Sequence, residues 1–369
     1  MGNRRQKIII SHKLGETCAV VVDGGEVNAI RIAREDSPQL VGNIYKGIVK
    51  NFLPGMQAAF VDIGRDKNVF LQFNASKNFS VGQSVLIQID KDEIGSKGAR
   101  ATLNISLAGK FLIFLPTLGY VGVSNKIRGS ERERLHALAK KIRPKESGVI
   151  VRTAAENCDE EFLLNELENL MKLWNKILER NSKRKPPALL HNDNDLIEKI
   201  FRDEFTEDTE IIVDNLKIYR RLVKLIPEEK IIFYEGDAKI FEEFSVAEEI
   251  STIHQHELSL PSGGQIVIDK TEALTAIDVN TGKFIGAENF EETILKTNLE
   301  AAELILKQLR LRDLGGIIIV DFIDMNSDAH KNFLMNFLRE RAAFDRNKTK
   351  IVDMTPLGLV EITRHSSHR

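Results

Sequence analysis

The sequence predicts a multi-domain α/β protein, α+β overall, because strand-like and helix-like segments alternate along a chain too long for one core. The chain has 369 residues, and single hydrophobic cores rarely grow beyond about 250–300 residues. Runs rich in valine and isoleucine dominate residues 6–34, short strand-like runs fill residues 40–107, and a strand–helix–strand pattern occupies residues 273–321. Two or three domains are therefore expected.

The N-terminal segment predicts a small antiparallel unit that is followed by a barrel. "KIIIS" and "CAVVVDGGEVNAIRIA" contain β-branched runs, and "DGGE" is a hairpin turn signal. Five short strands follow: "NIYKGIVKNFL", "QAAFVDIG", "NVFLQF", "QSVLIQID" and "ATLNISL". Five strands at this spacing are typical of a small barrel of the OB-fold class.

Further along the chain, helical periodicity alternates with strands. "SGVIVRTAA" (147–155) predicts a strand, and residues 158–180 predict an amphipathic helix. A longer helix is expected over 289–313, since five apolar residues repeat at spacings of 4, 3, 4 and 3: Leu295, Leu299, Ala302, Leu306 and Leu309. Strand-like runs flank this helix, so we expect a βαβ unit with parallel strands.

The composition is that of a soluble globular protein. Hydrophobic residues make up 42% and charged residues 29%, and neither a membrane-spanning run nor a signal peptide is evident, so we expect a cytoplasmic protein. The two cysteines cannot form a disulfide framework or a four-cysteine zinc site. The net charge of −2 leaves a locally positive surface possible. P-loop and nucleophile-elbow patterns are absent, which disfavours NTPases and serine hydrolases.

Two carboxylates are the strongest candidates for chemistry. Asp278 ends one strand-like run and Asp321 ends the next. Parallel neighbouring strands end at the same edge, so both carboxylates should meet there, and Mg²⁺ binds one or two carboxylates while keeping waters. Asn280 is placed to bind a ligand or a metal-bound water. The alternative is that strand-end aspartates cap helices or turns, a role that fits Asp324, beside Ser327, better than metal binding does.

Two other groups of residues fit contacts to nucleic acid. Phe60 and Phe70 could stack on unpaired bases, with Lys46, Lys91 and Lys97 contacting phosphates, as in OB-folds that bind single strands; the alternative is that both rings belong to the barrel core. Arg152 and Thr153 could present a guanidinium and a hydroxyl to a phosphate monoester. The alternative for Arg152 is a structural ion pair.

Five segments, in this order, resemble the catalytic half of the ribonuclease E/G endoribonucleases. They are "NIYKGIVKNFLPGMQAAFVDIG", "SGVIVRTA", "LPSGGQIVIDKTEALTAIDVNTG", "ETILKTNLEAAELILKQLRLRDLGGIIIVDFIDM" and "LGLVEITR". The resemblance implies an RNase H-like scaffold (1–36 and 192–253) with an inserted OB-fold RNA-binding domain of the S-one type (37–108) and a 5′-sensor region (109–191). A DNase I-like catalytic subdomain (254–369) is implied to follow.

The resemblance also assigns roles to the candidate residues. Asp278 and Asp321 match the family's Mg²⁺ ligands, and Asn280 matches its catalytic asparagine. The remaining matches are RNA contacts: Arg152 and Thr153 at a 5′-monophosphate, and Phe60, Phe70 and Lys97 in the inserted domain. The expected function is Mg²⁺-dependent endonucleolytic cleavage of single-stranded, A/U-rich RNA. We expect it to favour 5′-monophosphorylated substrates, in messenger RNA decay and in ribosomal and transfer RNA processing.

Two departures from the family pattern bear on this expectation. Asn125 in "GVSNK" stands where the family has arginine, which would weaken 5′-end discrimination. No Cys-Pro-x-Cys motif follows "EITRHSSHR", so the family's zinc site, shared by two subunits, is not expected in this chain, although the full-length protein is expected to form a homodimer or higher oligomer. The alternatives are an RNA-binding fragment with little or no catalysis and a metal-dependent phosphoesterase that acts on DNA or small phosphates.

Overall fold

The computed structural model describes residues 6–35, 39–73, 79–93, 98–281, 290–345 and 347–366. The chain divides into two compact units, one formed by residues 1–36 and 206–369 and the other by residues 37–205. Each unit is described by itself below. Among the described residues, no helix combines the length and the apolarity needed to cross a bilayer.

The first unit begins with a mixed sheet whose strand order is β15-β14-β1-β2-β3. Its strands are β1 (Lys7–Lys13), β2 (Glu16–Asp23), β3 (Glu26–Arg34), β14 (Glu210–Val213) and β15 (Ile231–Phe233). The predicted hairpin is confirmed: β2 and β3 pair antiparallel, and the turn residues Gly24 and Gly25 have φ angles of 63° and 88°. Two consecutive positive φ angles characterise the turn that suits a two-residue hairpin. The RNase H-like assignment of this region stays a prediction.

Short helices accompany this N-terminal sheet. They are α4 (Leu216–Leu222), α5 (Ile240–Glu243) and α6 (Ala247–Thr252). Ile240 and Val246 pack with Ile9, Val20 and Ile212 of the sheet in one buried cluster. The side chain of Asn215 accepts hydrogen bonds from the first turn of α4, which satisfies backbone donors that a helix start leaves unpaired.

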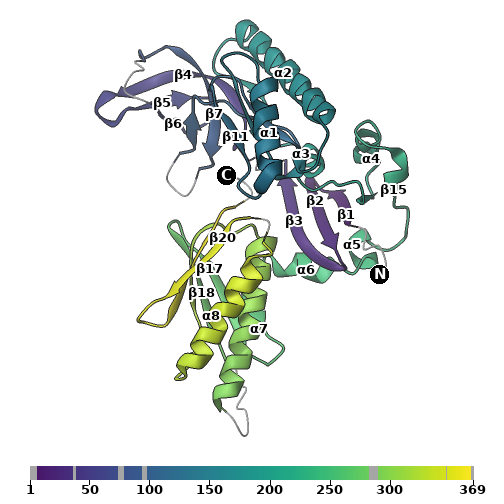
Figure 1. The fold of residues 1–369 in the computed structure, drawn as a ribbon, viewed down its shortest axis with the longest axis vertical. Coiled ribbons are helices and arrows are strands. Elements are labelled where there is room, and N and C mark those ends of the chain that lie inside the picture. Colours follow the sequence, from purple (N-terminus) through teal and green to yellow (C-terminus); the bar gives the residue numbers. More distant parts are fainter. Residues whose placement is uncertain are drawn as a thin grey trace. The chain divides into compact units, whose positions relative to one another are not determined.

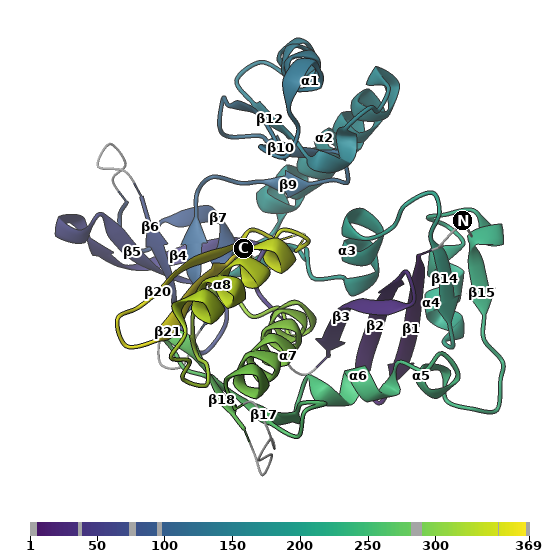
Figure 2. The ribbon, with the colours of Figure 1, turned by 60° about the horizontal axis from the view of Figure 1, so that its bottom comes forward.

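The second sheet of this unit contains the predicted strand–helix–strand segment. Its order is β16-β17-β18-β19-β21-β20, with β16 (Glu257–Ser259), β17 (Gln265–Lys270), β18 (Leu274–Asn280), β19 (Gly316–Asp321), β20 (Thr349–Met354) and β21 (Leu359–Arg364). The helices α7 (Phe290–Leu311) and α8 (Asp328–Ala342) lie side by side on one face of this sheet (Figure 1, Figure 2). The core of this subdomain lies between the helices and the sheet.

The βαβ prediction is confirmed. β18 and β19 pair in parallel, with α7 between them in the sequence. Of the predicted apolar stripe, Ala302, Leu306 and Leu309 are buried, whereas Leu295 and Leu299 are partly buried at the margin of the core. The helix ends where Asp313 adopts a left-handed conformation with φ 47°.

The second unit contains a barrel-like sheet, consistent with the predicted OB-fold. Its strands are β4 (Ile44–Leu53), β5 (Ala58–Asp62), β6 (Val69–Gln72), β7 (Ser84–Lys91) and β8 (Arg100–Thr102). They are connected in the order β4-β5-β6-β8-β7, and β7 pairs back onto β4. The last predicted strand is shorter than expected, because Thr102 Oγ1 accepts a hydrogen bond from the backbone N–H of Asn104 in a turn. The chain then leaves the barrel.

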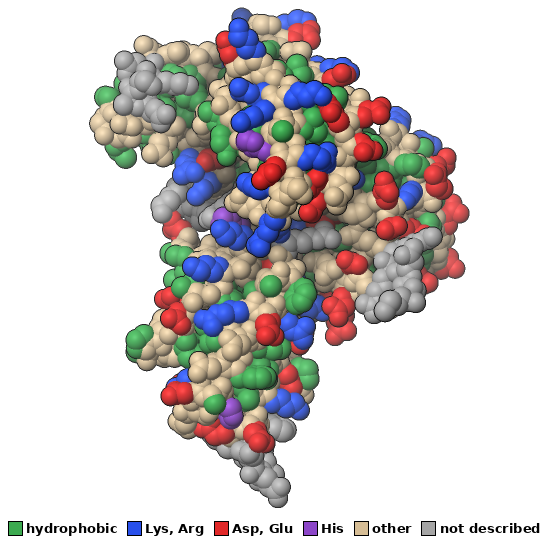
Figure 3. Space-filling view, viewed as in Figure 1, with side chains coloured by type: hydrophobic (Ala, Val, Ile, Leu, Met, Phe, Trp, Pro, Cys, Tyr) green, Lys and Arg blue, Asp and Glu red, His purple; other side chains and the backbone are tan. Residues whose placement is uncertain are grey.

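The rest of the second unit is a small sheet with helices. β9 (Leu107–Ala108), β10 (Leu112–Leu115), β11 (Val121–Val123) and β12 (Gly148–Val151) form this sheet in the order β11-β12-β10-β9. The helices are α1 (Gly129–Ile142), α2 (Glu160–Lys183) and α3 (Leu196–Asp203), and β13 (Ala188–His191) pairs with β4. The strand and helix predicted over residues 147–180 are therefore confirmed. Figure 3 shows several lysine and arginine side chains over α1, whose last turn carries Lys140 and Lys141.

Candidate functional site

The candidate catalytic residues lie on the face of the β16–β21 sheet that the helices leave uncovered. Along β18, Thr275, Ile277 and Val279 are buried, while Asp278 and Asn280 are exposed. This alternation follows from the two-residue period of a strand. The apolar residues pack against the helices, so the polar residues between them must face outward.

The pairing of β18 with β19 brings the two carboxylates together. Asp278 is the register partner of Asp321 in the parallel ladder, and neighbouring strands lie about 4.8 Å apart. Both side chains are exposed. The juxtaposition predicted from the sequence is therefore present in the structure, whereas the metal-binding role of the pair stays a prediction.

Asn280 joins this pair through a direct contact. Its Nδ2 donates to Oδ2 of Asp278 at 2.6 Å, which is the geometry of a charge-assisted hydrogen bond. Residues two apart on a strand share a face, and this spacing makes the contact possible. The bond restrains one carboxylate oxygen of Asp278 and leaves Oδ1 available for another partner.

The charge at this edge is unbalanced among the described residues. Burial of the Asp321 carboxyl group raises its pKa above the ordinary value, and the charges of Asp278 and Asp324 raise it further. No described lysine or arginine forms an ion pair with any of these three carboxylates. The capping role expected for Asp324 is wrong: the side chain of Ser327 caps α8, accepting from His330 N at 3.4 Å. Asp324 instead adds negative charge near Asp321.

This donor set fits a hard divalent cation. Carboxylate oxygens are the ligands that Mg²⁺ prefers, and it usually takes one or two of them and keeps several waters. No group of three or more His, Cys, Asp or Glu side chains suited to a metal occurs in the described part of the chain. Asp278 and Asp321 could supply two carboxylates to such a cation, which would keep open positions for water and phosphate.

The loop that follows Asp321 is held by a residue that the sequence reasoning missed. Asn298 of α7 is fully buried; its Nδ2 donates to the carbonyl of Ile323 at 2.8 Å, and its Oδ1 accepts from the N–H of Ile323 at 3.0 Å. The sequence contained a signal for this role, since a carboxamide next to the apolar stripe of a helix must find buried partners.

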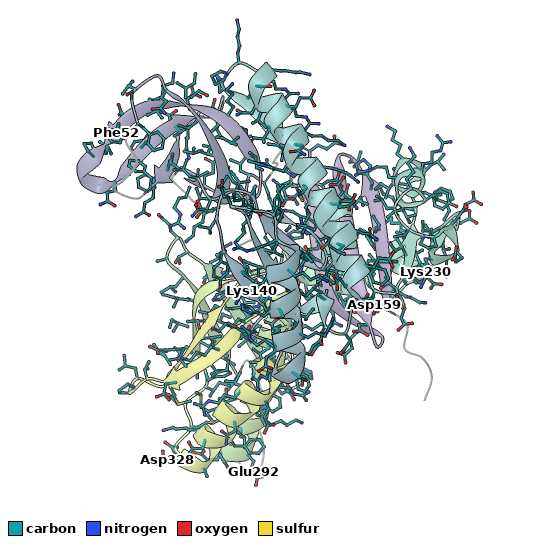
Figure 4. The ribbon with its side chains drawn as sticks, turned by 45° about the horizontal axis from the view of Figure 1, so that its top comes forward. Phe52, Lys140, Asp159, Lys230, Glu292 and Asp328 are labelled. Carbon is teal, nitrogen blue, oxygen red and sulfur yellow. The ribbon has the colours of Figure 1, made fainter. Side chains whose placement is uncertain are left out.

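Glu292 and Asp328, labelled in Figure 4, mark the first turns of α7 and α8 at one end of this subdomain.

In the barrel, Phe60 and Phe70 are register partners on β5 and β6. Their rings contact edge to face with centroids 5.8 Å apart, and both side chains are partly exposed. The barrel core consists of other residues, among them Val61 and Leu71 from the same strands. The alternative that these rings are core residues is therefore disfavoured, and their contact with RNA stays a prediction.

The structure bears differently on the lysines that were expected to contact phosphates beside these rings. Lys97 lies outside the described residues. Nζ of Lys46 donates to the carbonyls of Asn181 and Arg184 at 2.6 and 3.0 Å, at the C-terminal end of α2, where a cation is favourable. Lys46 therefore has a structural role, and the phosphate contact expected for it stays a prediction.

Arg152 and Thr153 follow β12 in the second unit. The hydroxyl of Thr153 is 2.8 Å from that of Ser124. The guanidinium of Arg152 forms an ion pair with Asp203, with NH2 2.7 Å from Oδ1. The structural ion pair that was the alternative for Arg152 is thus present, although the guanidinium has further N–H groups for a ligand. Binding of a 5′-phosphate by this pair stays a prediction.

Comparison with known proteins identifies the family. The family model described as "Ribonuclease E/G family" matches residues 106–367. Ribonuclease G of Salmonella typhimurium (strain SL1344) is 40% identical, over 97% of this chain and 79% of that protein.

The chain belongs to the ribonuclease E/G family. Ribonuclease G of Haemophilus influenzae is 40% identical over 95% of this chain and 77% of that protein. Ribonuclease E of Escherichia coli K12 is 37% identical over 98% of this chain, which covers 37% of that longer protein. The predicted family and the predicted enzyme class, an endoribonuclease, are confirmed.

Proposed function

We propose that this protein is a Mg²⁺-dependent endoribonuclease that cleaves single-stranded, A/U-rich RNA at the edge formed by Asp278, Asn280 and Asp321. The observation that carries the proposal is the register pairing of Asp278 with Asp321 on parallel strands, with both side chains exposed. Membership of the ribonuclease E/G family supports the reaction class.

In this proposal the protein's own residues fix the reacting geometry. Asp278 and Asp321 would hold Mg²⁺, and Asn280 restrains the Oδ2 of Asp278 through its 2.6 Å bond. A bound Mg²⁺ supplies Lewis-acid stabilisation of the charge that develops on the phosphate. Asn298 holds the backbone of Ile323 two residues beyond Asp321, and so it limits the movement of that carboxylate.

The barrel and the small sheet of the second unit would bind the rest of the strand. Phe60 and Phe70 present partly exposed rings, and stacking of a base on an aromatic ring is tolerant of sequence. Arg152 and Thr153 would bind a terminal monophosphate, so RNA with a 5′-monophosphate would be the favoured substrate. The corresponding processes are messenger RNA decay and the processing of ribosomal and transfer RNA.

A cleavage assay on a short fluorescent single-stranded RNA tests this function. With Mg²⁺ the RNA should be cut into products with a 5′-phosphate and a 3′-hydroxyl, and excess EDTA should stop the reaction. Binding of the RNA without cleavage would favour an RNA-binding protein with little catalysis. Equal cleavage of single-stranded DNA would favour a broader phosphoesterase.

The 5′-end preference requires a separate measurement. RNA carrying a 5′-monophosphate should be cleaved with a higher kcat/KM than the same RNA carrying a 5′-hydroxyl, and Arg152→Ala should reduce this ratio. An unchanged ratio would exclude Arg152 from 5′-end recognition while leaving the assignment of the catalytic edge intact.

A further inference from the structure

The guanidinium of Arg152 is held from two directions by acceptors of its own unit. NH1 donates to the carbonyl of Gly109 at 2.5 Å, and NH2 donates to Oδ1 of Asp203 at 2.7 Å. The side chain of Arg152 is only 30% exposed. A guanidinium has five N–H donors, so these two contacts fix its plane and leave donors for a ligand.

Asp203 is itself fixed by a second arginine. Arg202 approaches both oxygens of Asp203, with Nε 3.3 Å from Oδ1 and NH2 3.2 Å from Oδ2. NH1 of Arg202 donates to Oδ1 of Asp193 at 3.2 Å. Charges therefore alternate from Asp193 through Arg202 and Asp203 to Arg152. The carboxylate of Asp203 is therefore restrained by Arg202 as well as by Arg152.

The position of Gly109 is fixed by a different carboxylate. Glu166 of α2 accepts three consecutive backbone N–H bonds, from Lys110 at 2.6 Å, Phe111 at 2.8 Å and Leu112 at 2.7 Å. This contact ties the segment that follows Gly109 to a long helix. Both acceptors of the Arg152 guanidinium therefore belong to restrained elements, α3 on one side and the β9–β10 connection on the other.

The electrostatics keep Asp203 ionised in this arrangement. Burial acts to raise the pKa of Asp203, but the charges of Arg202 and Arg152 outweigh it, so the pKa lies below its ordinary value. Because Asp203 is already matched by Arg202, a phosphate that arrives at Arg152 need not displace it. The free donors of the guanidinium suffice for a bidentate contact.

We propose that Asp203 is a positioning residue for 5′-end recognition: it holds the guanidinium of Arg152 in the orientation that binds a terminal monophosphate. This inference rests on the proposed role of Arg152. A flexible arginine would lose much of its rotamer freedom on binding phosphate, and a guanidinium that is already fixed loses less. Asp203 would thus contribute to selectivity without touching the substrate.

A double-mutant cycle tests the proposal. The variants are Asp203→Asn, Arg152→Ala and the two combined, and the readout is the ratio of kcat/KM for 5′-monophosphorylated over 5′-hydroxyl RNA. We expect Asp203→Asn to lower this ratio about tenfold, chiefly by raising KM for the 5′-monophosphorylated RNA. This factor is the lower end of the loss typical for residues that orient a ligand-binding group. In the Arg152→Ala background the same change should have no effect, because its target is gone.

Two further variants keep the result interpretable. Asp203→Glu retains the carboxylate and should recover part of the ratio. Glu160→Gln removes the carboxylate of an exposed ion pair with Lys141 in the same unit, and it should leave the ratio unchanged.

Three results would overturn the positioning role. In the first, Asp203→Asn leaves the ratio unchanged. In the second, Asp203→Asn raises the ratio, as expected if Asp203 competed with phosphate for Arg152. In the third, Asp203→Asn changes the ratio by the same factor in the Arg152→Ala background. If Arg152→Ala alone left the ratio unchanged, the 5′-sensor assignment and the positioning role would both be wrong.

Discussion

Arg364, the last residue of β21, offers a sharp test of how the subdomain built on the β16–β21 sheet is held together. Its side chain is 2% exposed and forms ion pairs with Asp313 (NH1–Oδ1, 3.0 Å) and Asp345 (Nε–Oδ2, 2.8 Å). NH1 also donates to the carbonyl of Leu314 at 2.8 Å. Arg364 therefore connects β21 to the end of α7 and to the segment after α8.

Replacing Arg364 with methionine would remove the cation that pairs with both Asp313 and Asp345. Breaking a buried pair in this way costs roughly 3–5 kcal/mol of the free energy of unfolding. Asp345 keeps two other donors, Oγ1 of Thr349 at 2.6 Å and the N–H of Asn347 at 3.0 Å, so we expect a loss of about 3 kcal/mol. A typical domain has only about 5–15 kcal/mol of stability, so the change should be readily measured.

The loss should depend on pH with a definite sign. Burial acts to raise the pKa of Asp345, but the hydrogen bonds from Arg364 and Thr349 outweigh it, so the pKa lies below its ordinary value. Such a group stabilises the fold above its unfolded pKa of about 3.9, and this stability is lost as the pH falls through the folded pKa. Without Arg364 the carboxyl group of Asp345 is harder to ionise, so the destabilisation should be full at pH 7 and shrink on acidification.

Amide hydrogen exchange in β20 and β21 is the appropriate assay, because it reports the local free energy of opening. Arg341→Met is the matched control: its ion pair with Glu303 spans 3.6 Å, both side chains are at least half exposed, and such pairs contribute about 0–1 kcal/mol. If Arg364→Met lowered protection no more than Arg341→Met, the reasoning about the buried pair would be refuted.

Three other changes probe the sites. Asn280→Ala should lower kcat about 10–100-fold by releasing Asp278, with RNA affinity unchanged; an unaffected kcat would remove Asn280 from the site. Phe60→Ala should weaken binding of single-stranded RNA by about 1–3 kcal/mol in a fluorescence-anisotropy titration, and equal affinity would return the ring to a structural role. Asp324→Asn should lower the pKa of Asp321, measured by NMR in metal-free buffer with EDTA, because it removes one of the charges that raise that pKa; an unshifted pKa would contradict this.

Local patterns were sufficient to predict that Asp278 and Asp321 lie together at one edge of the sheet. Two apolar runs that end in aspartate, separated by a helix of suitable length, imply parallel strands and a shared edge, and the register of Asp278 with Asp321 agrees with this. The barrel was predicted for a similar reason, since its strands are short and follow one another in sequence.

Contacts between residues distant in sequence could not be predicted in this way. The partner of Arg152 is Asp203, 51 positions away, and Lys46 donates to carbonyls 135 and 138 positions away. A single arginine or lysine has no periodicity that reveals its partner, so a structural and a ligand-binding role look alike. Asp324 and Ser327 are separated by too few residues for spacing alone to decide which one caps α8.

The most direct test of the catalytic edge is single-turnover cleavage of single-stranded RNA across a range of Mg²⁺ concentrations, for Asp278→Asn, Asp321→Asn and the unmodified chain. Asp353→Asn, an exposed position on β20 of the same sheet, is the control. A metal ion that stabilises transition-state charge supplies several kcal/mol, so each catalytic-edge variant should be slower by roughly 10³-fold, with RNA binding retained and the control unaffected. Cleavage within about tenfold of the unmodified rate in either variant would contradict the assignment.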